Sequence, residues 1–209
     1  LAKRNKVKRG VARITLTRGR GARGYAVRKC DDPTSIITVK PYLPDEQKQK
    51  NGITVVPVTD IRKDPKSPFA NVKSTSALDK IYAIESAKRN NADEALLMSV
   101  DGHLASLASA NLFWVKGSAL HTPSLDCGIL AGVTRGSILK LASGSGLEVV
   151  EGQYAPDVLK EADEVFVTNS LIEIQTVKKV TGLFESVGNG AVTKKLLELY
   201  QNLILNRFV

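Results

Sequence analysis

Hairpin signals and helical periods alternate along this sequence, and that mixture constrains its fold more than any other feature. Asp101-Gly102 and Lys116-Gly117 each separate two short apolar runs, a pattern that predicts two-residue hairpin turns. Apolar residues at helical spacing predict helices over 76–89, 134–142 and 192–205. Because hairpins and helices are interleaved, we expect a mixed α/β (α+β) fold and not a doubly wound parallel sheet. Other patterns predict strands at 53–58, 148–150 and 164–168, a helix at 156–161 and a charged loop at 60–68.

A polar, proline-containing stretch follows residue 40 and divides the sequence. Before it, the alternating run 11–17 and the run 35–39 predict two strands. Proline and polar residues together favour a loop, so we expect a domain boundary there. The expected parts are residues 1–42 and residues 45–209.

The net charge of +9 comes from one end of the chain. Residues 1–30 hold 11 Lys and Arg and no acidic residue, whereas the rest holds 19 basic and 21 acidic residues. A basic arm can bind nucleic-acid phosphates, but base stacking needs aromatic side chains, and this arm has Tyr25 alone. The favoured interpretation is a solvated face with a few anion-binding arginines, and we expect no nucleic-acid partner.

Several other classes of protein find no support in the sequence. No apolar run is long enough to cross a bilayer, and no signal segment opens the chain, so we expect no membrane association. The two cysteines, Cys30 and Cys127, match neither a disulfide framework nor metal-ligand spacing, which favours a reducing, cytoplasmic setting. His103 and His121 stand alone among strand residues, so we interpret both as structural and expect no metal site.

The segment 19–24 matches the pattern GxGxxG and follows a predicted strand. A dinucleotide site requires a helix to begin directly after these glycines, and residues 25–33 have no helical period. We therefore interpret the glycines as a turn that presents Arg23 and Tyr25. The fork-shaped guanidinium of Arg23 suits a carboxylate.

Three further segments could carry chemistry. Gly132-Val133-Thr134 precedes a predicted helix, where backbone N–H groups and a hydroxyl suit an anion such as phosphate. Thr168-Asn169-Ser170 follows a strand and offers a second set of small donors. Lys73 lies in an otherwise uncharged stretch; desolvation there would lower its pKa and favour Schiff-base chemistry. Each signal is weak alone, and from the residues alone an ordinary surface lysine is the favoured interpretation of Lys73.

Taken in order, these segments resemble the class IV aminotransferase family, which comprises fold-type-IV pyridoxal-phosphate (PLP) enzymes. The resemblance runs over essentially the whole chain. It rests on the ordered set Arg18-Gly19 to Arg23-Gly24-Tyr25, Val72-Lys73, the run 91–97 (NADEALL), Asp101-Gly102, the run 110–114 (ANLFW), Thr122-Pro123, the run 130–135 (LAGVTR) and the run 162–166 (ADEVF). Within the family, the chain most resembles aminodeoxychorismate lyases.

The resemblance implies a fold and a role for each matching residue. Residues 1–42 would be a remnant of a small α/β sandwich domain, and 45–209 a larger α/β pseudo-barrel domain. Lys73 would bind PLP covalently and shuttle the proton. The other implied roles are ring packing by Leu130, phosphate binding by Val133, Thr134, Asn169 and Ser170, and binding of a substrate carboxylate by Arg23 and Tyr25. The family also implies a homodimer that acts on a small amino substrate.

Two departures from the family pattern affect the expected reaction. Ser106 stands where the family places a glutamate opposite the pyridine nitrogen, followed by Leu107 in place of glycine. A glutamate keeps that nitrogen protonated and strengthens the electron sink, whereas serine can only hydrogen-bond a neutral nitrogen. The resemblance places the family's phosphate-gripping arginine before Leu1, so we expect an N-terminal segment of about 70 residues to be missing.

An elimination that forms an aromatic product depends less on the electron sink than transamination does. We therefore expect a folate-pathway lyase that converts 4-amino-4-deoxychorismate to 4-aminobenzoate and pyruvate. Two alternatives stay open, a branched-chain or D-amino-acid transaminase of the same fold and a weak or inactive PLP-fold homologue.

Overall fold

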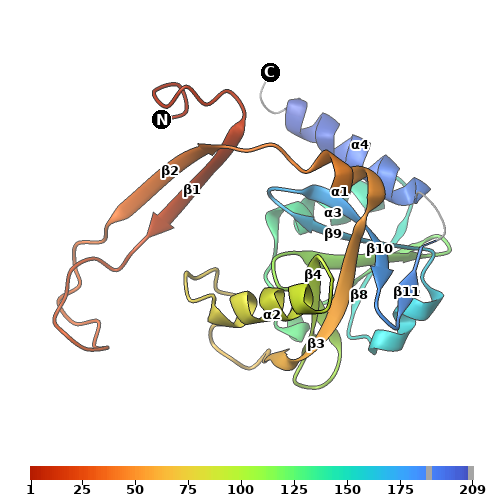
Figure 1. Cartoon of the computed structure of the whole chain (residues 1–209), viewed down its shortest axis with the longest axis horizontal. Coiled ribbons are helices and arrows are strands. Elements are labelled where there is room, and N and C mark those ends of the chain that lie inside the picture. The colour runs from red at the N-terminus through yellow and green to blue at the C-terminus, as the bar shows by residue number, and fades with distance from the viewer. Residues whose placement is uncertain (187–189, 207–209) are drawn as a thin grey trace. The chain divides into compact units, whose positions relative to one another are not determined.

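The computed structural model describes residues 1–186 and 190–206. It divides the chain into two compact units, Leu1–Asp45 and Glu46–Val209. The sequence-based boundary was placed between residues 42 and 45. Most of their helices and strands are labelled in Figure 1.

The first unit is built around one antiparallel hairpin. Strand β1 (Gly10–Leu16) pairs with β2 (Ser35–Pro41) in a register that sets Ile14 opposite Ile37. Residues 17–34 form the connection and contain no helix, as the absence of a helical period predicts. Gly19 has φ +87°, and a Cβ there would overlap the carbonyl oxygen of Asp32, so only glycine fits this turn.

The second unit contains a mixed sheet that closes on itself, which confirms the expected mixed α/β fold. Within the described residues, β9 pairs with both β6 and β10, so the path β10-β3-β4-β5-β6-β9 returns to β10 and forms a barrel-like ring. The strands are β3 (Ile53–Lys63), β4 (Glu94–Ser99), β5 (Leu104–Leu107), β6 (Asn111–Lys116), β7 (Ala119–Pro123), β8 (Glu148–Gly152), β9 (Glu164–Asn169), β10 (Glu173–Val180) and β11 (Phe184–Glu185).

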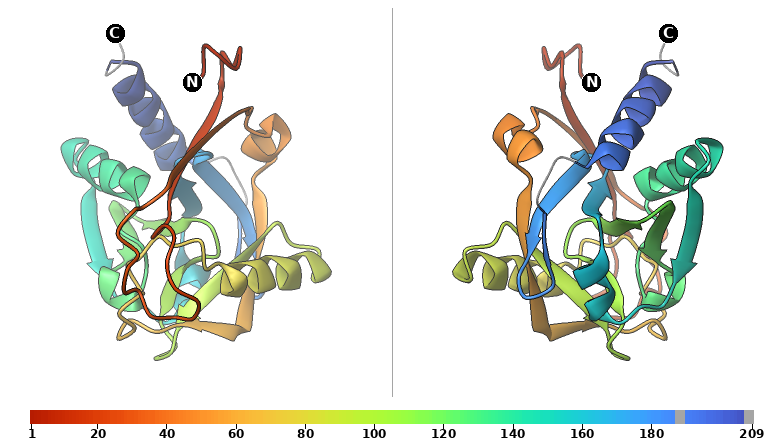
Figure 2. Two further views of the ribbon diagram at one scale, coloured as in Figure 1. Left: turned by 90° about the vertical axis from the view of Figure 1, so that its left-hand side faces the viewer. Right: turned by 90° about the vertical axis from the view of Figure 1, so that its right-hand side faces the viewer.

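Two sets of helices cover the outer face of this sheet, and Figure 2 shows them well separated. Helix α2 (Leu78–Arg89) packs through Ala83 and Ala87 against a cluster that includes Leu97 of β4. Helices α3 (Val133–Gly144) and α4 (Ala191–Leu205) pack on Phe113 and other residues of the neighbouring strands. The remaining helical segments are α1 (Glu46–Asn51) and the 3-10 turns η1 (Leu125–Cys127) and η2 (Pro156–Glu161). The inside of the ring is filled by a separate apolar cluster.

The expected loop over 60–68 is wrong in its first part, because β3 continues to Lys63. Pairing with β4 shifts register between Pro57 and Arg62 and then resumes. A bulge of this kind accommodates a proline, which cannot donate to the ladder, and lets a strand carry charged residues to its exposed end.

Candidate functional site

A row of five side chains, three of them polar, crosses the outer face of the sheet. Residues directly opposite one another on antiparallel strands place their side chains on the same face. The pairs Leu97–Ser106, Ser106–Asn111, Asn111–Thr168 and Thr168–Ile174 therefore form one continuous row over β4, β5, β6, β9 and β10.

The two ends of this row are apolar, and its three middle members are polar. Leu97 belongs to the cluster beneath α2, and Ile174 belongs to the cluster beneath α3 and α4. Between them, Ser106 is 8% exposed, Asn111 7% and Thr168 0%. Polar residues in the gap between two apolar clusters, at the same level of one sheet face, mark the candidate site.

Asn111 connects the row to the loop that precedes α3. Its Nδ2 donates to the carbonyl oxygen of Leu130 at 3.0 Å. A Cβ added to Gly132 would overlap Asn111 Oδ1, so this glycine lets the loop backbone approach the row closely. The structure thus brings Leu130 beside Asn111 of the row.

The N-terminus of α3 has the features of an anion site. Gly132 is its N-cap residue and no side chain caps the helix, so the first backbone N–H groups lack a capping acceptor. Val133 is 81% exposed at this end. Thr134 is buried instead, and its Oγ1 lies 3.3 Å from the hydroxyl of Tyr200. The structure therefore makes the backbone of Thr134 a better candidate for anion binding than its side chain.

Thr168 has a buried polar atom without a partner. Its Oγ1 is buried and forms no hydrogen bond among the described residues. Burying a hydroxyl without a hydrogen bond is unfavourable, and such atoms cluster at functional sites. Thr168 adjoins Asn169 and Ser170, so the predicted second set of donors begins within the row and continues into the turn after β9.

Asn169 uses its side chain to shape the turn after β9. Its Oδ1 accepts hydrogen bonds from the backbone N–H groups of Leu171, at 2.8 Å, and Ile172, at 3.0 Å. Its Nδ2 donates to the carbonyl oxygen of Ser109 at 3.2 Å. Ser170 lies inside this turn and is exposed.

Lys73 lies on the exposed segment that leads into α2, the helix packed beside Leu97. Its environment in the single chain is therefore not the desolvated one that Schiff-base chemistry favours. Its charge nevertheless affects Lys80 of α2. Burial and the nearby positive charges of Lys63 and Lys73 lower the pKa of Lys80, and the negative charge of Asp79 opposes this effect. Two lysines thus lie on the α2 side of the row.

Arg23 and Tyr25 belong to the first unit, in the glycine-rich connection between β1 and β2. Both side chains are exposed, and Tyr25 is fully so. The predicted role of these two residues in binding a substrate carboxylate stays a prediction.

The donor set around the row fits a phosphorylated pyridine cofactor. Backbone N–H groups at the uncapped N-terminus of a 12-residue helix suit a dianionic phosphate, and the row contains the unpartnered Thr168 hydroxyl. Ser106 offers a neutral hydrogen-bonding group to a ring nitrogen. Among the described residues no group of three or more His, Cys, Asp or Glu side chains could hold a metal ion.

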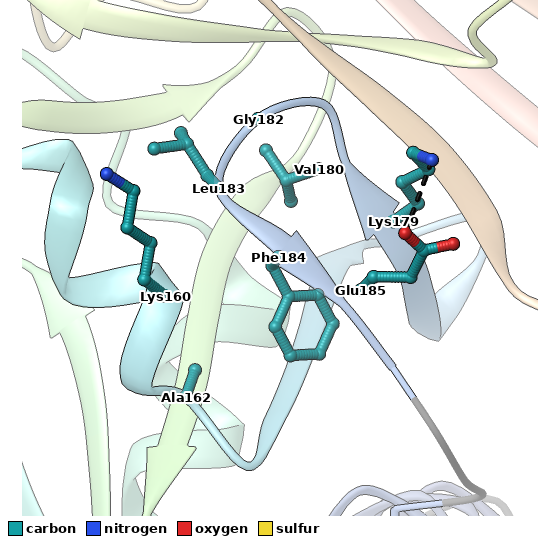
Figure 3. A pocket seen from close by; sticks show the side chains of 8 residues that line it. All are labelled: Lys160, Ala162, Lys179, Val180, Gly182, Leu183, Phe184 and Glu185. Atoms are coloured by element: carbon teal, nitrogen blue, oxygen red, sulfur yellow. Dashed lines mark hydrogen bonds and ion pairs between the residues drawn. The ribbon is translucent and has the colours of Figure 1, made fainter.

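A pocket of about 360 Å³ lies elsewhere, between η2 and the turn that joins β10 to β11 (Figure 3). Two lysines, Lys160 and Lys179, stand at its edge, and Lys179 pairs with Glu185 at 3.3 Å. None of its lining residues is a predicted site residue, so this pocket is separate from the polar row.

Sequence reasoning missed two members of the row as site residues. Asn111 appeared only as part of the ANLFW run, and Thr168 only as the start of a weak donor group. An asparagine inside an otherwise apolar strand was an available signal, because a buried amide needs partners that the strand itself does not supply.

Comparison with known proteins shows similarity to one enzyme family. The sequence profile described as amino-transferase class IV matches residues 1–180. The aminodeoxychorismate lyase of Bacillus subtilis (strain 168) is 34% identical over 209 residues, which cover 99% of this chain and 70% of that protein.

Two solved structures share the fold. The crystal structure of a putative 4-amino-4-deoxychorismate lyase from Legionella pneumophila gives a TM-score of 0.88 at 27% identity, covering 96% of this chain and 72% of the other. The branched-chain amino acid aminotransferase of Escherichia coli gives 0.90 at 27% identity, covering 97% and 68%. In the part of this chain that the structure describes, no helix is long and apolar enough to span a membrane.

Proposed function

Since the chain belongs to the class IV aminotransferase family, whose members are PLP-dependent enzymes, we propose that it is a PLP-dependent lyase. The proposed reaction converts 4-amino-4-deoxychorismate to 4-aminobenzoate and pyruvate. This proposed reaction is more specific than family membership, because the relatives include both lyases and transaminases.

Ser106 is the observation that carries the choice of reaction. It occupies the second position of the polar row, is buried, and carries no charge. When bound, PLP supplies an electron sink, and a neutral partner at its ring nitrogen makes that sink weaker. An elimination that yields an aromatic product tolerates a weak sink better than transamination does. The 34% identity to the Bacillus subtilis lyase over 99% of this chain supports the same choice.

Ser106 of the row and the other predicted site residues have distinct proposed roles. Backbone N–H groups of Val133 and Thr134, together with Ser170, hold the phosphate, and Leu130 packs against the ring. Ser106 donates a hydrogen bond to the ring nitrogen. Lys73 would hold the cofactor covalently and would move the proton at the substrate α-carbon. Arg23 and Tyr25 bind a substrate carboxylate, for which a guanidinium fork is well shaped.

Pyruvate release tests the proposal directly. The full chain with PLP is incubated with 4-amino-4-deoxychorismate and no keto acid, and pyruvate is measured with a coupled dehydrogenase. We expect pyruvate in an amount equal to the 4-aminobenzoate formed, and none with Lys73→Ala. Absence of pyruvate from a PLP-loaded protein would contradict the lyase assignment.

A transaminase is the second candidate, supported by the TM-score of 0.90 to the Escherichia coli branched-chain enzyme. It predicts that turnover requires a keto-acid acceptor and consumes a branched-chain or D-amino acid. Keto-acid-dependent loss of such an amino acid, without pyruvate release from 4-amino-4-deoxychorismate, would favour this candidate. PLP binding without either reaction would favour an inactive homologue.

A further inference from the structure

Glu94 is a buried carboxylate outside the chemistry proposed above. It begins β4, is 8% exposed and pairs with Val55 of β3. In the described part of the chain no Lys or Arg forms an ion pair with it. Burial raises the pKa of Glu94, and hydrogen bonds from Ser109 and backbone N–H groups oppose this effect. A buried carboxyl group is retained at a cost in stability, so its contacts indicate its use.

The contacts of Glu94 lead to the turn between β5 and β6. The hydroxyl of Ser109 donates to Glu94 Oε2 at 2.5 Å, a short and directional hydrogen bond. The backbone N–H of Ala95 donates to Oε1 at 2.9 Å. Ser109 itself is exposed, whereas its neighbours Ala108 and Ala110 are buried, so the carboxylate anchors the exposed residue between them.

Ser109 in turn holds the residue that shapes the next loop. Its carbonyl oxygen accepts the hydrogen bond from Asn169 Nδ2, and Asn169 Oδ1 closes the turn through the N–H groups of Leu171 and Ile172. Glu94, Ser109 and Asn169 thus form one chain of hydrogen bonds across β4, the β5–β6 turn and β9. That chain ends at the turn that contains Ser170.

We propose that Glu94 is a positioning residue, which through Ser109 and Asn169 holds the Ser170 turn where it can bind the cofactor phosphate. This inference rests on the proposed function, because it takes Ser170 as a phosphate ligand. An exposed turn has many accessible conformations, and fixing one of them before binding raises affinity by lowering the ordering cost. Glu94 serves this purpose without touching the cofactor.

The test compares two ligands that differ only in the phosphate. PLP and pyridoxal are titrated into the full chain, and binding is followed by absorbance of the bound chromophore. For Glu94→Gln we expect the Kd for PLP to rise about tenfold, as expected for loss of a charge-assisted hydrogen bond. The Kd for pyridoxal, which lacks the phosphate, should change by less than about twofold.

Two further variants make the comparison decisive. Glu85→Gln changes an exposed carboxylate of α2 that pairs with Lys88, and it should leave both Kd values unchanged. Ser109→Ala removes the intermediate hydroxyl at an exposed position, so it tests the same chain even if Glu94→Gln does not fold. We expect a smaller but equally phosphate-selective loss for Ser109→Ala.

Equal losses for PLP and pyridoxal in Glu94→Gln would overturn the proposal, because they would show a general structural role. An unchanged ratio of the two Kd values in Ser109→Ala would overturn it as well. A wild-type chain that binds PLP but forms no pyruvate would contradict the lyase reaction alone. A wild-type chain that binds no PLP would overturn both.

Discussion

Ser106 is the residue on which the reaction type depends. Its neighbours in the row are Leu97 and Asn111, so a longer acidic side chain there would lie on the same buried face. We predict that Ser106→Glu raises the rate of half-transamination with an amino acid by about tenfold, because a carboxylate favours the protonated pyridine nitrogen. The rate is measured from the change in cofactor absorbance during a single turnover. Ser106→Gln, similar in size and neutral, is the control; an equal increase in both variants would contradict the electrostatic explanation.

His121 makes a second prediction at the scale of one residue. It stacks on Trp114, with ring centroids 5.4 Å apart, and burial lowers its pKa, an effect that Lys116 strengthens and Glu148 opposes. The imidazole of His121 therefore binds a proton less well in the folded protein than in the unfolded chain. Well above the ordinary histidine pKa of about 6.5, this difference does not affect the free energy of unfolding. As pH falls through that value toward the lower pKa of the folded state, the free energy of unfolding decreases.

We expect His121→Phe, which keeps an aromatic ring against Trp114, to lose less stability than wild type when pH falls from about 7.5 to about 5.5, a range that spans the ordinary pKa of histidine. Urea denaturation at the two pH values measures the difference. Equal losses in both proteins would show that His121 does not contribute to acid sensitivity.

At the scale of elements, the N-terminus of α3 makes the sharpest prediction. A Cβ on Gly132 would overlap Asn111 Oδ1, whereas a Cβ on Gly136, in the same helix, would meet nothing within 4 Å. Gly132→Ala should destabilise the fold by about 1–3 kcal/mol and weaken PLP binding. Gly136→Ala should stabilise it by about 0.5–1 kcal/mol, because alanine is the better helix former. Thermal denaturation and PLP titration measure both effects; a harmless Gly132→Ala would contradict the close approach.

Elements with a clear period or turn signal were predictable, and elements set by distant pairing were not. Residues 76–89, 134–142 and 164–168 were expected from sequence and are present with small shifts at their ends as α2, α3 and β9. Strand β10 was missed because Glu173–Val180 alternates poorly and carries two lysines. Its position depends on pairing with β3, which lies far earlier in the chain, as well as with its neighbours β9 and β11.

The candidate site was predictable in parts. Gly132-Val133-Thr134 carried a local signal, because a helix N-terminus is encoded by neighbouring residues. The joining of Ser106, Asn111 and Thr168 depends on strand register across β5, β6 and β9, which local patterns do not encode. The hydrogen bond that ties this turn to the β5–β6 turn was not predictable either, because Asn169 donates to Ser109, 60 residues away.

At the scale of the whole molecule, we propose that the chain forms a homodimer, as the family resemblance implies. Light scattering coupled to gel filtration should then give twice the 22.6 kDa mass of one chain. Lys73 and the N-terminus of α3 are exposed in the single chain, so association would help to exclude water from the site. A monomer at micromolar concentration that still turns over substrate would contradict this proposal.

The account depends most on Lys73 as the residue that binds PLP covalently, and one absorbance measurement tests this directly. Wild-type chain with PLP should show a band at about 400–430 nm, the region of a lysine-bound chromophore. Lys73→Ala should lose that band. Lys80→Ala is the matched control, because Lys80 lies on α2, within reach of the charge of Lys73, and has a lowered pKa. Lys80→Ala should keep the band. A band that is lost in Lys80→Ala and kept in Lys73→Ala would contradict the account.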